Sequence, residues 1–151
     1  MDASLIRPRI LVADDSPRLR LLVVAALSGR FDVFPLPPGE DPLRAARSRR
    51  PELVLFAMDR QNADEVLRAC RTLRTDVRPI DRVAVYAAGR PPRPADVVTE
   101  AWRADGYLTG DIDADGVRSF VDAVLRGERP VRVPRARAGG LGRMVERLRG
   151  R

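Results

Sequence analysis

The sequence contains no histidine and no lysine, so all 28 of its basic residues are arginine. The absence of histidine excludes Ser-His-Asp triads and histidine-based metal sites. The absence of lysine excludes Schiff-base chemistry and the lysine of phosphate-binding loops. Arginine cannot take over these roles, because its guanidinium stays protonated. Several large classes of active site are therefore excluded before any motif is considered.

The sequence also has little cysteine and no long hydrophobic run. The single cysteine, Cys70, cannot form an internal disulfide, which indicates a reducing compartment. Arginine, aspartate or proline interrupts every apolar run before it reaches the roughly 18 residues of a membrane span, and no apolar run of signal-peptide length begins the chain. We expect a soluble, cytoplasmic protein whose 151 residues bury a core without disulfides.

Charge is distributed unevenly along the chain. Residues 1–128 contain 20 arginines and 20 acidic residues, whereas residues 129–151 contain eight arginines and only one acidic residue, Glu146. The whole net charge of +7 therefore lies in the second segment. This pattern predicts a charge-balanced domain over 1–128, followed over 129–151 by a basic linker and a short amphipathic helix.

Apolar runs typical of buried strands alternate with segments of helical periodicity. The expected strands are 9–13, 31–36, 53–58, 82–88 and 106–109. The first expected helix opens at Ser16 and Pro17 and stops at Gly29, and the others are 41–49, 63–73, 95–104 and 114–126. Five successive βα units predict an α/β fold with three layers, a doubly wound (βα)5 arrangement around a parallel five-stranded sheet.

Binding sites in such sheets form at the carboxyl ends of the strands. That rule selects a set of strand-end residues: Asp14, Asp15, Ala57, Met58, Asp59, Ala87, Ala88, Thr109 and Gly110.

Three motifs occur in order along the chain: ILVADDS at 10–16, DVFPLPPGEDPLRAARSRRPELVLFA at 32–57, and ADGYLTG at 104–110. Over about residues 7–127 the chain resembles the response-regulator receiver domains of two-component signalling, which have a flavodoxin-like fold. The resemblance implies a specific chemistry. In active receivers, two acidic residues after the first strand hold Mg²⁺, an aspartate ending the third strand accepts a phosphoryl group, and a Ser/Thr and a Lys contact the phosphate.

This chain departs from the receiver pattern at three of those positions. Asp14 and Asp15 match the acidic pair, but Ala57 stands in place of the acceptor aspartate. Ala87 stands in place of the Ser/Thr, and Gly110 in place of the lysine. An alanine methyl has no oxygen with which to form an acyl phosphate or bind Mg²⁺. The sequence therefore predicts a degenerate pseudo-receiver without catalytic residues, acting in bacterial signal transduction through phosphorylation-independent protein contacts.

Two alternatives concern the remaining carboxylates. Asp59 lies two residues after Ala57, so a register change in the strand would turn it into a substitute phosphoryl acceptor. Asp14 and Asp15, with Asp59, could bind Mg²⁺ weakly with water completing the coordination; no other cofactor is expected. The alternative for the acidic pair is capping of the following helix.

The resemblance also implies an output surface. Tyr107 matches an aromatic position that changes rotamer when receivers are phosphorylated, and Trp102, Tyr107 and the helix that carries Phe120 would lie on one face. Receivers often use this face to dimerise or to bind target proteins. Trp102 is the expected anchor, because large aromatic side chains dominate binding hot spots. Core packing is the alternative for these aromatic residues.

The basic tail carries a separate amphipathic pattern. Leu141, Met144, Val145 and Leu148 follow i, i+3, i+4, i+7 spacing, with Arg143 and Arg147 between them. So short a helix is marginal alone in water and needs a docking surface. A partner protein is the favoured surface; the chain's own domain, an anionic membrane or a nucleic acid are the alternatives. A nucleic-acid- or membrane-associated regulator is accordingly the second function hypothesis.

Overall fold

The computed structural model describes residues 6–132, and the predicted tail helix over 141–148 lies outside them. The chain forms one parallel sheet in the order β2-β1-β3-β4-β5-β6. Its strands are β1 (Arg9–Ala13), β2 (Asp32–Pro35), β3 (Leu53–Ala57), β4 (Arg82–Ala88), β5 (Tyr107–Gly110) and β6 (Val131–Arg132). The prediction of an α/β fold with a parallel sheet is confirmed.

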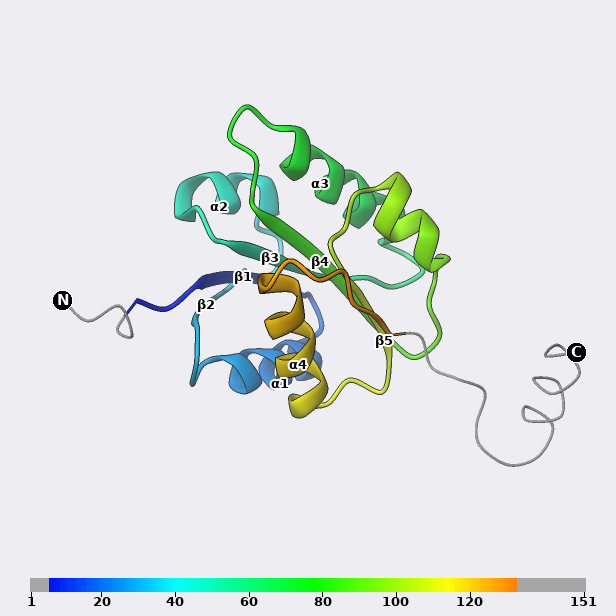
Figure 1. The fold of residues 1–151 in the computed structure, drawn as a ribbon, viewed down its shortest axis with the longest axis horizontal. Coiled ribbons are helices and arrows are strands. Elements are labelled where there is room, and N and C mark those ends of the chain that lie inside the picture. Colours follow the sequence, from blue (N-terminus) through cyan, green and yellow to red (C-terminus); the bar gives the residue numbers. More distant parts are fainter. Residues whose placement is uncertain (1–5, 133–151) are drawn as a thin grey trace, which may run out of the picture.

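Helices cover both faces of the sheet (Figure 1). One face carries α1 (Pro17–Leu27) and α4 (Ala114–Leu125), and the other carries α2 (Pro42–Arg49), α3 (Ala63–Thr75) and the π-helical segment η2 (Val97–Ala101). The apolar stripe of α3 packs on one side of the sheet, while that of α4 packs on the opposite side. The central strands β1, β3 and β4 are buried from both faces, which explains their nearly continuous apolar sequences.

The sheet has one strand more than the sequence predicted. Strand β6 lies in the segment assigned to the basic tail and pairs in parallel with β5, so that Tyr107 aligns with Val131 and Leu108 with Arg132. The Tyr107 amide donates to the Pro130 carbonyl over 2.9 Å. The sequence did not predict this additional strand, because two residues stabilised by backbone pairing carry no apolar periodicity.

The helix expected over 95–104 is shorter than predicted and ends as a π-helix. The Trp102 amide donates to the Val97 carbonyl, five residues earlier, and Arg103 adopts a left-handed φ of 63° that stops the helix. The following residues enter the sheet, because the Asp105 amide donates to the Val83 carbonyl and the Asp105 carboxylate accepts from the Val83 amide. Helical periodicity alone could not reveal that the residues after Trp102 bond to β4 instead of continuing the helix.

Candidate functional site

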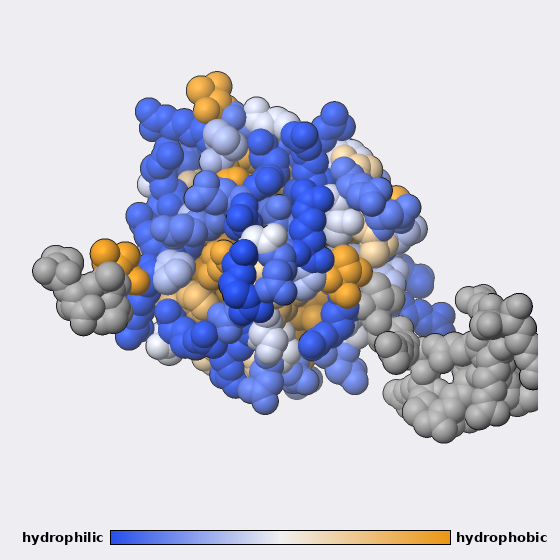
Figure 2. Space-filling view, viewed as in Figure 1, coloured by the Kyte–Doolittle hydropathy of each residue, from blue (hydrophilic) through white to orange (hydrophobic). Residues whose placement is uncertain are grey.

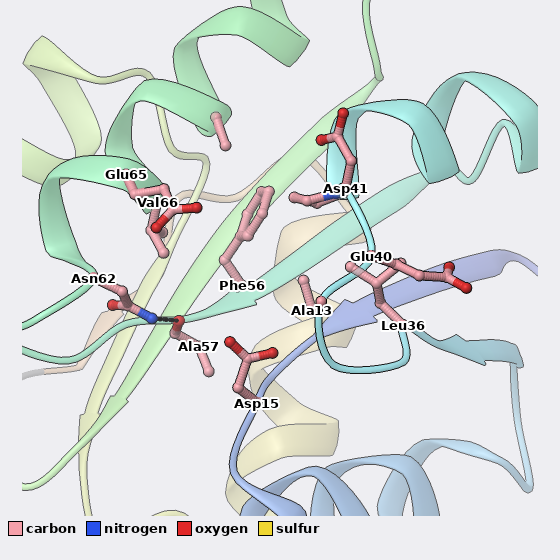
Figure 3. Close-up of a pocket in the computed structure, with 13 residues that line it drawn as sticks. Ala13, Asp15, Leu36, Glu40, Asp41, Phe56, Ala57, Asn62, Glu65 and Val66 are labelled. Carbon is pink, nitrogen blue, oxygen red and sulfur yellow. Dashed lines mark hydrogen bonds between the residues drawn. The ribbon is translucent and has the colours of Figure 1, made fainter.

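The carboxyl ends of the strands surround a cleft. Its wider part, about 580 Å³, is lined by Asp14, Asp15, Ala57, Asp59 and Ala88 among others. A second hollow of about 350 Å³ shares Asp15 and Ala57 and extends toward α2 (Figure 3). The structure thus gathers most of the residues that the strand-end rule selected. Ala87 is buried and Gly110 lies beyond β4, so neither lines the cleft.

Asp14 is buried, with 4% of its surface exposed, and both of its oxygens are engaged. Its Oδ2 accepts a 2.6 Å hydrogen bond from the Tyr86 hydroxyl, and its Oδ1 accepts from the Ser16 amide at 2.8 Å. Burial raises the pKa of Asp14 above its ordinary value, although the Tyr86 hydroxyl, the Ser16 amide and the charge of Arg20 oppose that rise. The Ser16 amide lies before the first helical residue, and α1 has no side-chain capping hydrogen bond, so the expected capping by the acidic pair is not seen.

Sequence reasoning missed Tyr86, which is 1% exposed. It pairs with Ala57 in the register of β3 and β4, and side chains of paired residues point to the same face of a sheet. Tyr86 and Ala57 both pack on the face covered by α1 and α4. Burial and the nearby Asp14 carboxylate raise the pKa of Tyr86, so it remains a neutral donor. In the sequence, the one sign of this role was that Tyr86 is an aromatic residue with a hydroxyl group among the small apolar residues of β4.

Asp59 is exposed and serves the turn that leads into α3. Its Oδ1 accepts from the amides of Gln61 and Asn62, both at 2.8 Å, and its own amide donates to Asn62 Oδ1 at 2.7 Å. The side-chain amide of Asn62 also donates to the Ala57 carbonyl at 3.2 Å (Figure 3). These bonds hold the end of β3 and the start of α3 together.

The arrangement does not fit Mg²⁺. One Asp14 oxygen is held by a hydroxyl and the other by a backbone amide, while Ala57 supplies no oxygen at all. Over residues 6–132 no group of three or more acidic or cysteine side chains is disposed to hold a metal ion. Asp15 is exposed and makes no ion pair with any other residue of that range. Mg²⁺ requires nearly ideal octahedral coordination by oxygen atoms, which the engaged oxygens of Asp14 and the methyl group of Ala57 do not provide.

The end of β5 is closed by backbone bonds between two glycines. Gly89 and Gly110 exchange reciprocal amide-to-carbonyl hydrogen bonds of 2.9 Å, forming an antiparallel bridge at the ends of parallel strands. Their φ angles are 83° and 93°, a region that favours glycine. Any side chain at position 110 would therefore be strained. Next to it, the Thr109 hydroxyl donates to the Arg132 carbonyl at 2.9 Å, which ties β5 to β6.

The expected output face is not a single surface. Tyr107 is fully buried, and its hydroxyl donates to the Arg93 carbonyl at 3.2 Å. Phe120 is 4% exposed and packs on the opposite face of the sheet, because α4 covers the α1 side. Placing Phe120 with Trp102 on one interface was therefore wrong. Trp102 alone of the three is partly exposed, and part of its ring packs against the core beside η2.

The described helices contain none that is long and apolar enough to cross a membrane. No protein-family model matches the chain, and no curated protein matches it.

Solved structures do match in fold. The chemotaxis response regulator CheY4 of Vibrio cholerae is 16% identical with a TM-score of 0.63, over 79% of this chain and 99% of that one. A response regulator from Thermotoga maritima is 21% identical with a TM-score of 0.61, over 80% and 99%. A LuxR-family DNA-binding response regulator from Staphylococcus aureus is 15% identical with a TM-score of 0.60, over 78% and 98%. The fold is therefore that of a receiver domain.

Proposed function

We propose that this chain is a pseudo-receiver, a signalling module that binds a protein partner without being phosphorylated and without catalysing a reaction. The observation that carries the proposal is Ala57, which ends β3 in the cleft beside Asp15 (Figure 3). In the receiver pattern that position carries the acceptor aspartate. An acyl phosphate requires a carboxylate oxygen, and a methyl group offers none.

The neighbouring structure supports the same conclusion. A lysine is expected where Gly110 stands, but the φ of 93° and the bridge to Gly89 are suited to glycine. The electrostatic stabilisation that lysine would give to transferring phosphoryl oxygens is thus missing from this strand end.

Tyr86 supports the proposal from inside the sheet. Its side chain lies on the same face as Ala57, and its hydroxyl reaches the Asp14 carboxylate. A neutral hydroxyl satisfies the buried carboxylate at this point, which makes a cation unnecessary for Asp14. Loss of the acceptor and engagement of Asp14 are therefore two parts of one arrangement.

For partner binding, Trp102 remains the anchor that we propose. It follows η2, is partly exposed, and precedes the left-handed Arg103. π-Helical turns occur frequently at functional sites. Figure 2 shows a mostly hydrophilic face in which hydrophobic side chains form small, separate groups. A partner contact built around one aromatic anchor suits such a surface better than a broad apolar interface.

Phosphorylation is tested by treating the full chain with acetyl phosphate and Mg²⁺ and measuring the intact mass. We expect no phosphoryl adduct, and no spectral change with beryllofluoride. Asp59→Asn is the matched control, since Asp59 is the alternative acceptor. An adduct on the wild type that disappears in Asp59→Asn would overturn the proposal and assign the acceptor to Asp59.

Partner binding is tested with the full chain immobilised in parallel with Trp102→Ala and Leu21→Ala. Leu21 on α1 is 71% exposed and serves as a control for removal of an exposed apolar side chain. We expect Trp102→Ala to lose a partner that the other two proteins retain, with circular dichroism confirming that all are folded. Equal retention of the partner by the wild type and both variants would contradict the role of Trp102. Sedimentation of the wild type shows whether the partner is a second copy of this chain.

A further inference from the structure

The hollow beside Asp15 has an apolar floor and an acidic rim. Leu36, Phe56 and Val66 are buried residues that form part of the floor. Asp15, Glu40, Asp41 and Glu65 form the rim, and all four are exposed. In Figure 3 the carboxylates of Asp15 and Glu65 point toward the space in front of Phe56. We call this hollow, defined by these seven residues, the acidic cleft.

The rim carboxylates have no cationic partners among residues 6–132. The ion pairs of that range involve other acidic residues, such as Asp64 with Arg93 and Asp76 with Arg47. Asp41 accepts from the Leu43 amide as the cap of α2, which uses one of its oxygens. No arginine lines the acidic cleft itself. Arg44 and Arg49 line a neighbouring hollow on the far side of Glu40 and Asp41 without forming ion pairs to them. The acidic cleft therefore suits an occupant that is both cationic and apolar.

The chain itself contains a segment with that chemistry. Residues 133–151 include six arginines and one glutamate. Leu141, Met144, Val145 and Leu148 supply apolar side chains, with Arg143 and Arg147 between them. The segment thus offers apolar groups for the floor and guanidinium groups for the rim, where arginine can form bidentate bonds to carboxylates.

The segment also begins at the correct edge of the sheet. Strand β6 runs parallel to β5, so its last residue, Arg132, lies at the carboxyl edge where the acidic cleft opens. Three strand spacings separate β6 from β3, or about 15 Å. Residues 133–140 span about 25 Å when extended. The connection is therefore long enough to bring residues 141–148 to the cleft of the same molecule.

We propose that residues 133–151 dock in the acidic cleft of their own domain, with their apolar side chains on the Phe56 floor and their arginines at Asp15 and Glu65. This segment then covers the surface where active receivers carry their phosphoryl group. The docking depends on the cleft and the tail charge, and not on whether the proposed pseudo-receiver function is correct.

The test is paramagnetic broadening in the full chain. Gly140→Cys places a nitroxide label at the start of the tail's apolar segment, while Cys70 is fully buried and stays unlabelled. We expect the amide signals of Asp15, Ala57 and Glu65 to broaden strongly. Val77, which is 95% exposed beyond the other end of α3, should keep its signal.

Charge variants identify the contact. The double variant Asp15→Asn/Glu65→Gln should reduce the broadening at Ala57 at least several-fold, as should 1 M salt, which shortens the screening length to about 3 Å. The matched control Asp32→Asn/Asp81→Asn removes two exposed carboxylates near the amino ends of β2 and β4 and should leave the broadening unchanged.

Three results would overturn the proposal. The first is no broadening at the cleft in the wild type. The second is equal loss in both double variants, which would indicate a nonspecific charge effect. The third is broadening in a mixture of two proteins, one that carries the nitroxide but no ¹⁵N and one that carries ¹⁵N but no nitroxide. Broadening in that mixture would mean that the tail docks on a second molecule.

Discussion

Tyr86 and Asp14 are joined by a 2.6 Å hydrogen bond that reaches from β4 to the end of β1, although β3 lies between these two strands. The phenol can make this connection because its register partner on β3 is Ala57, whose methyl leaves the space open. The bond supplies a donor to a carboxylate that burial would otherwise leave costly to ionise. The small residue, the phenol and the carboxylate thus form one structural unit.

Tyr86→Phe should destabilise the protein by about 1–3 kcal/mol, because it leaves a buried carboxylate without its hydroxyl donor. The matched control is Tyr107→Phe, which removes the hydroxyl bonded to the Arg93 carbonyl. That variant should lose only about 0.5–1.5 kcal/mol, typical of a bond between neutral groups. Urea unfolding of both variants measures the difference, and equal losses would contradict the importance assigned to Asp14.

The stability difference between wild type and Asp14→Asn should depend on pH. Burial raises the pKa of Asp14 above its ordinary value of 3.8, so the folded state holds this proton more tightly than the unfolded state. The contribution of Asp14 is fully present below pH 3.8 and is lost as the pH rises through the folded pKa. The free energy of unfolding of Asp14→Asn, relative to that of the wild type, should therefore be more favourable at pH 7 than at pH 3. Urea unfolding over this range checks the sign, and the opposite trend would refute it.

Gly110→Ala should lose about 1–2 kcal/mol, since a Cβ is disfavoured in the left-handed region. Gly29→Ala is the matched control: Gly29 is not in that region, and a Cβ there would meet no atom within 4 Å. It should be neutral or slightly stabilising. Thermal unfolding compares the two variants. A neutral Gly110→Ala would show that the bridge to Gly89 tolerates a side chain.

Gly106→Ala should destabilise the protein by about 1–3 kcal/mol through overpacking. A Cβ at this position would lie 2.9 Å from the ring of Phe120 and 3.0 Å from Val124. In a Phe120→Leu background the same substitution should cost less, because the clashing ring atoms are gone. A double-mutant cycle measures this coupling. Strict additivity would mean that Phe120 does not limit the space at Gly106.

Cys70 should resist thiol reagents while the protein is folded. It is buried completely, and burial raises the pKa of its thiol, so little thiolate forms at neutral pH. We expect reaction with a disulfide reagent to follow unfolding, with the rate increasing in urea. Rapid reaction in native buffer would show local opening of α3. Unfolded protein is the positive control.

The sequence by itself determined the alternation of strands and helices, because buried parallel strands and amphipathic helices have distinct periodicities. It also placed Asp14, Asp15, Ala57 and Asp59 near one another, since parallel strands end at a common edge. The absence of lysine and histidine is likewise a property of the sequence alone.

The tertiary structure decided what those residues contact. Tyr86 and Asp14 are 72 positions apart, and only the strand register brings the hydroxyl to the carboxylate. Strand β6 exists because backbone groups pair with β5, which leaves no pattern in side chains. Phe120 lies on the α1 side of the sheet because α4 packs there, and the chain that leaves η2 is joined to β4 by the hydrogen bonds between Asp105 and Val83. The periodicity of a segment indicates which of its sides is buried and which is exposed to solvent. Contacts between residues distant in the sequence depend instead on the topology of the sheet and on the need of each buried polar group for a hydrogen-bond partner.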